Sequence, residues 1–314
     1  MSTSRTSPAT GAQGRPAPGA ADCTGSAGPA PTSVAALVAA LVGGDQRALA
    51  RAITAVEDDT EAADAVLAAV AGHNRTAAVA GHNRTAAVAG HSRTAAVAGH
   101  TGTATVVGLT GPPGAGKSTL TDAMVGELRR RGRTVAVLAV DPSSPLSGGA
   151  ILGDRIRMLR HSEDPGVYVR SVAARGHLGG LFATVDRVLA VLAAWGPDVV
   201  LVETVGAGQS EVEIARFAQV KVVVSTPGLG DEVQAMKAGV LEIADILVVN
   251  KADQPGADAT ADQLRRVLHW RDPNRPAVPV VCTVATDGTG VGELVDLLQV
   301  AAPASTAAGG IDDG

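Results

Sequence analysis

The chain has few aromatic residues and few cysteines, and each shortage excludes a class of structure. Aromatic residues make up 2% of the 314 residues, while hydrophobic residues of all kinds make up 46%. A core with so few aromatic rings must be built of Val, Leu, Ile and Ala, a composition typical of a parallel sheet covered by helices. The two cysteines, Cys23 and Cys282, show no paired spacing. This favours a reducing cytoplasm over a disulfide-stabilised secreted protein.

Long apolar runs and an excess of positive charge are also missing. No run of 18 or more apolar residues occurs, so we expect no membrane span. The first residues include Arg5 and Arg15 but no apolar stretch, which argues against a secretory signal. The formal net charge is −5, so nothing indicates a nucleic-acid partner. These absences together predict a cytoplasmic protein.

What the sequence does contain is a phosphate-binding loop. Residues 111–118 read Gly-Pro-Pro-Gly-Ala-Gly-Lys-Ser and fit the pattern G-x-x-x-x-G-K-[ST]. A β-rich run precedes the loop and a helix is expected over 120–131, which is the strand–loop–helix context that phosphate binding requires. We expect Lys117 to reach the β- and γ-phosphates and the Ser118 hydroxyl to ligate Mg²⁺. The candidate nucleotide-binding residues here are Gly111, Pro112, Pro113, Gly114, Ala115, Gly116, Lys117, Ser118 and Thr119.

A second motif, Asn250-Lys251-Ala252-Asp253, follows an apolar run over 245–249. An aspartate at this place accepts hydrogen bonds from two N–H groups of guanine, and adenine offers no matching donors. After the last strand, Val284, Ala285 and Thr286 stand where GTPases place a backbone N–H against guanine O6. The sequence therefore predicts a site for GTP or GDP.

Strands and helices alternate from residue 104 onward. We expect strands over 104–110, 134–140, 166–170, 198–203, 220–225, 245–249 and 279–284. This alternation predicts an α/β fold of the P-loop NTPase kind, with a doubly wound, mainly parallel sheet that binds ligands at the carboxyl ends of its strands.

Acidic residues at other strand ends are candidate magnesium ligands. Asp141 can hold a magnesium-bound water or serve as a turn aspartate. Asp154 can be a second ligand or the N-cap of a helix. Glu203 begins Glu-Thr-Val-Gly206, which has the form of the D-x-x-G element with Glu for Asp. There Glu203 would orient water on Mg²⁺ and the Gly206 N–H would sense the γ-phosphate.

The candidate catalytic residues are Lys117, Glu203 and Gln209, with Gln209 a candidate to position the attacking water. The candidate metal ligands are Ser118, Asp141, Asp154 and Glu203.

Composition divides the chain into five segments. We expect a disordered tail over 1–33, a helical N-terminal segment over 34–70 with its third helix over 61–70, a nine-residue repeat or linker over 71–103, a GTPase domain over 104–301 and a disordered tail over 302–314. The repeat unit Gly-His-Asn-Arg-Thr-Ala-Ala-Val-Ala starts at Gly72 and again at Gly81. Its odd period turns successive units to opposite sides of a helix or strand, which favours a low-complexity expansion over a histidine metal site.

Taken together, these residues resemble the MeaB/ArgK family, the GTPase chaperones of adenosylcobalamin-dependent methylmalonyl-CoA mutase and related acyl-CoA mutases. The resemblance runs from about residue 44 to about residue 298. Beyond the two nucleotide motifs it is carried by residues 44–53, 141–149, 152–155, 203–211 and 227–234.

The resemblance implies a mechanism and a partner. Family members load the cobalamin cofactor onto the mutase and protect it, and GTP hydrolysis gates these steps through switch loops, here about 143–157, 175–181 and 205–213. It implies slow basal turnover and an adenosylcobalamin-dependent acyl-CoA mutase as partner. Members form a homodimer through a C-terminal helical arm, which residues 302–314 do not resemble.

Three other functions stay open at this point. One is a nickel metallochaperone GTPase of the hydrogenase or urease kind, for which His177 would be a ligand near a switch. Another is a transport-linked ATPase or kinase, against which Asp253 argues because adenine lacks the matching donors. The third is a non-catalytic GTP-binding adaptor, which the intact Lys117, Ser118 and Glu203 disfavour.

Overall fold

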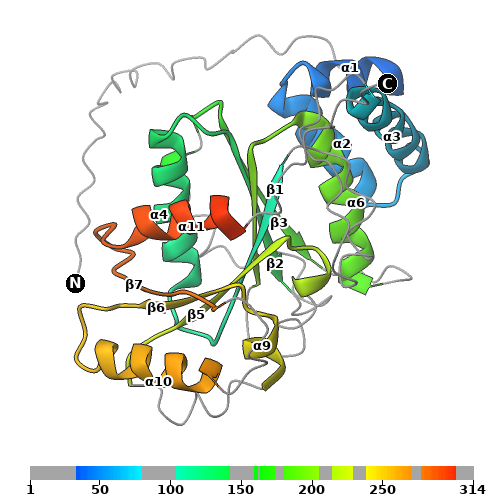
Figure 1. Cartoon of the computed structure of the whole chain (residues 1–314). Coiled ribbons are helices and arrows are strands. Elements are labelled where there is room, and N and C mark those ends of the chain that lie inside the picture. The colour runs from blue at the N-terminus through cyan, green and yellow to red at the C-terminus, as the bar shows by residue number, and fades with distance from the viewer. Residues whose placement is uncertain are drawn as a thin grey trace, which may run out of the picture.

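The computed structural model describes residues 33–79, 104–141, 159–161, 163–173, 180–204, 214–228, 238–269 and 277–301. Within these residues the centre is a seven-stranded sheet in the order β3-β2-β4-β1-β5-β6-β7, and every pairing is parallel (Figure 1). The strands are β1 (Thr105–Thr110), β2 (Val135–Asp141), β3 (Val167–Ala173), β4 (Val199–Thr204), β5 (Val220–Ser225), β6 (Ile246–Asn250) and β7 (Val280–Thr283).

Helices cover both faces of this sheet. They are α1 (Val34–Val42), α2 (Gln46–Glu57), α3 (Ala63–Val79), α4 (Lys117–Arg130), α6 (Gly180–Trp195), α9 (Ala238–Ile243), α10 (Ala257–His269) and α11 (Val291–Ala301), with 3₁₀ turns η1 (Leu159–His161) and η2 (Ile214–Arg216). The doubly wound α/β fold of a P-loop NTPase is therefore confirmed.

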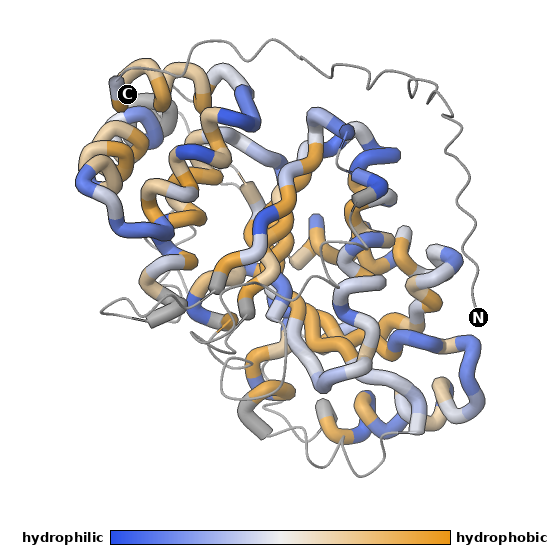
Figure 2. The backbone as a smooth tube through the Cα atoms, turned by 180° about the vertical axis from the view of Figure 1, so that it is seen from behind, coloured by the Kyte–Doolittle hydropathy of each residue, from blue (hydrophilic) through white to orange (hydrophobic). Residues whose placement is uncertain are grey.

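The core is aliphatic and lies in two layers, one on each side of the sheet. On one face α4 and α11 pack Leu120, Met124 and Leu294 against the central strands. On the other face α6 and the N-terminal helices cover β1 to β4, while α9 and α10 cover β5 to β7. Figure 2 shows the hydrophobic strands enclosed between the helices. Because parallel strands are buried on both faces, valine-rich runs such as β5 suit this place in the fold.

Helix α2 contacts β3, an edge strand of the sheet. Asp45 caps α2 by accepting hydrogen bonds from the backbone N–H groups of Arg47 and Ala48 at 2.7 and 3.1 Å. The Gln46 side-chain amide donates to the carbonyls of residues 165 and 167, each at 3.0 Å. Arg170 of β3 forms an ion pair with the buried carboxylate of Glu57 in α2. These contacts occupy a sheet edge that would otherwise be open to pairing with another chain.

The seven expected strands are confirmed, with ends that differ by up to three residues. The third helix is longer than expected: it begins at Ala63 and continues to Val79, where the prediction ended at Val70. The first repeat unit is therefore helical as far as Val79, and its Asn74 is 5% exposed. The P-loop helix α4 begins at Lys117, three residues before the expected start. The tail over 1–32, residues 80–103 and the tail over 302–314 lie outside the described residues.

Candidate functional site

The loop between β1 and α4 is shaped by glycines in the left-handed region. Gly111, Gly114 and Gly116 have φ of 140°, 77° and 83°. A Cβ atom on Gly111 would lie 2.1 Å from the carbonyl oxygen of Val224, so no larger residue fits there. The loop then runs directly into the amino end of α4, where backbone N–H groups and the helix dipole favour an anion. The geometry fits the phosphates of a nucleotide.

Lys117 lies inside this loop rather than in solvent. Its side chain is buried, and its Nζ donates to the carbonyls of Gly111 at 2.7 Å and Pro112 at 3.1 Å. Carbonyl acceptors hold the ammonium group in place without neutralising its charge. The residue is thus held where a phosphate oxygen in the loop would meet it.

Asn250 connects the phosphate loop to the two loops predicted to read the base. Its Nδ2 donates to the carbonyl of Ala115 at 2.9 Å, and its Oδ1 accepts from the Thr283 hydroxyl at 3.1 Å and the Ala285 N–H at 3.2 Å. The side chain is 2% exposed, so these bonds are shielded from water. A Cβ atom on Gly116 would lie 2.5 Å from Asn250 Nδ2, which is a second reason for glycine in the loop.

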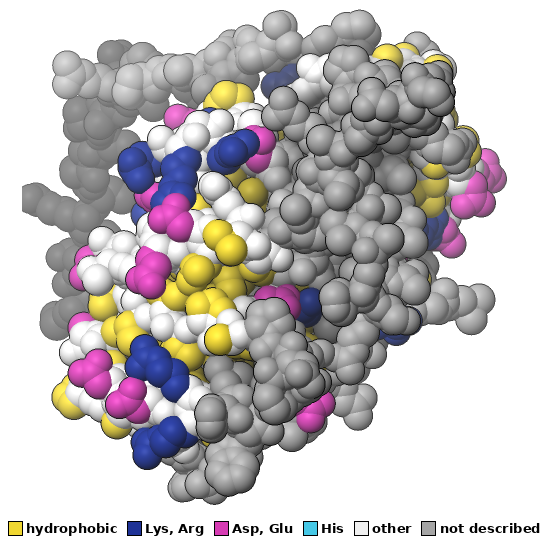
Figure 3. Space-filling model, viewed as in Figure 1, with side chains coloured by type: hydrophobic (Ala, Val, Ile, Leu, Met, Phe, Trp, Pro, Cys, Tyr) yellow, Lys and Arg dark blue, Asp and Glu magenta, His cyan; other side chains and the backbone are white. Residues whose placement is uncertain are grey.

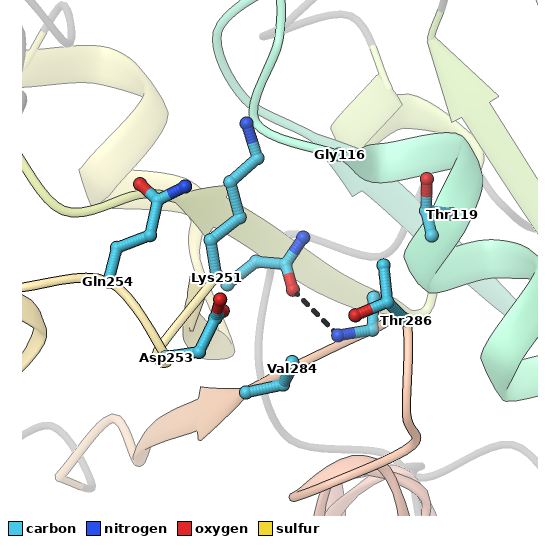
Figure 4. Close-up of a pocket in the computed structure, with 9 residues that line it drawn as sticks. Gly116, Thr119, Lys251, Asp253, Gln254, Val284 and Thr286 are labelled. Carbon is cyan, nitrogen blue, oxygen red and sulfur yellow. Dashed lines mark hydrogen bonds between the residues drawn. The ribbon is translucent and has the colours of Figure 1, made fainter.

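A pocket of about 240 Å³ opens beside this junction. Figure 4 shows Asp253 and Lys251 on one side of it, Val284 and Thr286 on another, and Gly116 with Thr119 on the side of the phosphate loop. Lys251 has φ of 56° and its Nζ donates to the carbonyl of Gly114 at 2.8 Å. The pocket therefore places the aspartate predicted to recognise guanine beside the loop predicted to hold the phosphates.

Ser118 and Glu203 meet at the other end of the phosphate loop. The Ser118 hydroxyl donates to the Glu203 carboxylate, which is buried at the end of β4. In the sheet register Glu203 lies beside Leu109 of β1 and Ala139 of β2. Hydroxyl and carboxylate oxygens are the donors that Mg²⁺ prefers, so the chemistry of this pair fits the metal.

Of the other residues predicted to bind the metal or the γ-phosphate, the structure describes only Asp141. Asp141 is the last residue of β2, the strand next to β4, so its backbone lies at the same edge of the sheet as Glu203. Asp154, Gly206 and Gln209 lie outside the described residues. Among the residues that the structure describes, no group of three His, Cys, Asp or Glu is arranged to hold a metal ion.

Sequence reasoning missed one residue that lines the pocket and one that supports it from below. Gln254 lines the pocket next to Asp253, and Thr283 holds Asn250 from the neighbouring strand. Thr283 could have been found from strand pairing alone, because Asn250 and Thr283 are partners in the β6–β7 register. Nothing in the sequence marks Gln254.

Comparison with known proteins places the chain in a family. Residues 79–313 match the family model described as methylmalonyl Co-A mutase-associated GTPase MeaB. The chain belongs to this family. A relative in Pyrococcus abyssi, named as a GTPase, is 48% identical over 262 residues, which cover 82% of this chain and 72% of the relative. The GTPase ArgK of Escherichia coli is 47% identical over 141 residues, or 45% of this chain and 43% of ArgK.

A solved structure has the same fold. The crystal structure of a LAO/AO transport system kinase superposes with a TM-score of 0.62 at 25% identity, covering 88% of this chain and 78% of that one. Family and fold together make this MeaB-family chain a P-loop GTPase, and the resemblance inferred from its motifs is confirmed. In the described part of the chain no helix is both long and apolar enough to cross a membrane.

Proposed function

We propose that this GTPase is the chaperone of an adenosylcobalamin-dependent acyl-CoA mutase of the methylmalonyl-CoA mutase type. In this role GTP binding and hydrolysis gate the loading and protection of the cobalamin cofactor. The family description, which names association with methylmalonyl Co-A mutase, supports this partner rather than a nickel enzyme. We place the protein in the cytoplasm, with slow turnover in the absence of the mutase.

The observation that carries the nucleotide part of the proposal is the Asn250 junction. One buried side chain fixes the phosphate loop through Ala115 and the base-reading loop through Ala285. A nucleotide that touches both loops therefore meets a preformed site, which lowers the ordering cost of binding. Asp253 would select guanine, and Lys117 would contact the β- and γ-phosphates.

A magnesium ion would be held by Ser118, Asp141, Asp154 and Glu203. When bound, it would neutralise charge that develops on the phosphate oxygens during hydrolysis. The chain's own residues would do the rest: Gly206 would sense the γ-phosphate through its N–H, and Gln209 would orient the attacking water. The contact of Ser118 with Glu203 supports this set because it joins two of the four proposed ligands.

The test is GTP hydrolysis by the purified full chain, with and without an adenosylcobalamin-dependent acyl-CoA mutase from the same source. We expect the mutase to stimulate hydrolysis strongly and GTP to be preferred over ATP. A Lys117→Ala sample serves as the control, since any hydrolysis that it retains comes from a contaminant. Hydrolysis that is indifferent to the mutase but changes with nickel would overturn the proposal in favour of a metallochaperone.

A further inference from the structure

Gln254 lines the pocket beside the phosphate loop, and neither nucleotide motif assigns it a role. It follows Asp253 directly, and it is exposed rather than packed into the core. A side-chain amide carries both hydrogen-bond donors and an acceptor. Gln254 therefore offers a bound nucleotide polar contacts that the Asp253 carboxylate and the phosphate loop do not supply.

A tight turn fixes the backbone at Gln254. The Gln254 N–H donates to the Lys251 carbonyl at 3.0 Å. Within the turn, the Ala252 N–H donates to the Thr283 carbonyl of β7, also at 3.0 Å. Pro255 comes next, and a residue that precedes proline is restricted to extended backbone. The direction in which the Gln254 side chain leaves the backbone is therefore set before a nucleotide binds, which lowers the ordering cost of a contact.

The polar side chains of the pocket differ in whether the protein itself uses them. Asn250 makes three hydrogen bonds within the protein, and Lys251 donates to the carbonyl of Gly114. In the part of the chain that the structure describes, the side chains of Asp253 and Gln254 make no hydrogen bond to a protein group. These two adjacent side chains are therefore available to a ligand, whereas Asn250 and Lys251 hold the pocket in shape.

The Lys251 side chain shows where the sugar of a nucleotide would lie. It starts in the base-reading loop, and its Nζ donates to the Gly114 carbonyl in the phosphate loop at 2.8 Å. A nucleotide with its base at Asp253 and its phosphates in the phosphate loop spans the same two loops, so its ribose lies beside Lys251. Figure 4 shows Gln254 on the Lys251 side of the pocket, across from Thr286, with its amide turned towards Lys251. The amide is therefore placed for the sugar.

We propose that Gln254 selects ribonucleotides: its side-chain amide forms a hydrogen bond with a hydroxyl of the ribose of the bound guanine nucleotide. A hydroxyl both donates and accepts, so it matches an amide in either orientation. The inference rests on the proposed function, because it takes the pocket to hold GTP or GDP. The contact is a neutral one at an exposed position, so its loss should lower affinity about fivefold, far less than the loss of a buried charged contact.

The test measures the affinity of the full chain for GDP, 2′-deoxy-GDP and 3′-deoxy-GDP by isothermal titration calorimetry. Gln254→Met keeps the length of the side chain and removes its polar atoms. Gln299→Met makes the same change at an exposed position in α11, outside the pocket, and is the matched control. For the wild type and the control, we expect at least one deoxy analogue to bind about fivefold more weakly than GDP, and that analogue identifies the hydroxyl.

Gln254→Met should bind GDP only as well as the wild type binds that analogue, and it should no longer distinguish the two. Changing the side chain and the ligand together isolates their contact in the manner of a double-mutant cycle. Gln254→Ala, which shortens the side chain, should give the same result. Because Gln254 is exposed, both variants should melt at the wild-type temperature in the absence of nucleotide.

Three results would overturn the inference while leaving the proposed function in place, since GDP binds in each of them. Gln254→Met could still bind the analogue more weakly than GDP, it could bind GDP and the analogue equally more weakly than the wild type does, or the wild type could bind all three nucleotides alike. A wild-type protein that binds no GDP would instead remove the proposed function, and this inference with it.

Discussion

Charged side chains at the two ends of the sheet make different kinds of contact. At the amino ends of the strands, charged side chains are paired with charged side chains, as in Arg131 with Asp296 at 2.5 Å and Lys221 with Asp245 at 2.8 Å. Figure 3 shows basic and acidic side chains side by side over this end of α4. At the carboxyl ends, Lys117 and Lys251 both donate to main-chain carbonyls of the phosphate loop.

We infer from this difference that the amino-end contacts serve stability and the carboxyl-end contacts serve ligand binding. An ion pair satisfies both of its charges within the protein, so it adds to stability and offers little to a ligand. A carbonyl oxygen accepts a hydrogen bond from a lysine but carries no full negative charge, so this kind of contact is compatible with binding an anion. The carboxyl ends are also where open α/β sheets bind ligands. Substitutions at the two ends should therefore change different measurements.

The largest effect is expected for Lys117→Ala at the carboxyl end. Loss of the buried ammonium group removes the charge that meets the phosphates, so GTP affinity should fall at least about 1000-fold, since a buried charged contact to an anion is worth several kcal/mol. Lys221→Ala at the amino end is the matched control, and it should bind GTP as the wild type does. Isothermal titration calorimetry measures both. Unchanged affinity in Lys117→Ala would remove the basis for distinguishing the two ends.

Asp253→Asn should have the next largest effect. The amide cannot accept from both guanine N–H groups, so GTP affinity should fall about 100-fold. Xanthine nucleotides, which present an acceptor in place of one donor, should gain in relative affinity. Asp258→Asn, an exposed change five residues later in the first turn of α10, should alter neither. Competition between GTP and XTP decides the point, and a variant that still prefers GTP would show that the base is read by other residues.

Glu127→Gln tests the amino end directly. Hydrogen bonds from Arg130 lower the pKa of Glu127 from 4.5 to about 2, and Arg131 adds to the effect. A carboxyl with a lowered pKa stabilises the fold above its unfolded-state pKa, and this contribution is lost as the pH falls through 4.5 towards 2. The variant should lose about 1 kcal/mol of unfolding free energy at pH 7 and very little near pH 2.

Urea denaturation at the two pH values measures this contribution. Glu163→Gln, at an exposed position in the turn before β3, serves as the control. GTP affinity at pH 7 should be the same for both variants and the wild type. A Glu127→Gln variant that loses affinity while keeping its stability would contradict the separation between the two ends.

The two ends also differ in how far the sequence predicts them. The carboxyl-end motifs are predictable because phosphate and guanine binding demand particular residues at fixed spacing, so Gly111 to Ser118 and Asn250 to Asp253 could be recognised directly. The amino-end pairs join residues far apart in the sequence, such as Arg131 and Asp296, and no local pattern marks them. The pairing of Asp122 in α4 with Arg160 and His161 is equally unmarked in the sequence, since these partners are 38 and 39 residues away.

The length of α3 shows a second limit of sequence reasoning. The expected end at Val70 followed from the idea that a nine-residue repeat cannot bury one constant face, which holds for many copies but not for the first. Asn74 of that copy is buried, and its Nδ2 lies 3.5 Å from the carbonyl of Ala190 in α6. Packing against α6 therefore accounts for the extension of α3 into the first repeat unit.

The smallest effect is expected for a deletion that lies outside both ends of the sheet. Removing residues 81–98 takes out two whole repeat units and keeps Asn74, so GTP affinity, hydrolysis and melting temperature should stay at wild-type values. Removing residues 72–89 takes out the same length but brings Ser92 to the place of Asn74. This second deletion should lower the melting temperature by about 2–4 °C, because the contact of the Asn74 amide with the Ala190 carbonyl is lost, and should leave GTP hydrolysis unchanged. Equal melting temperatures would mean that the first unit packs no more specifically than its copies.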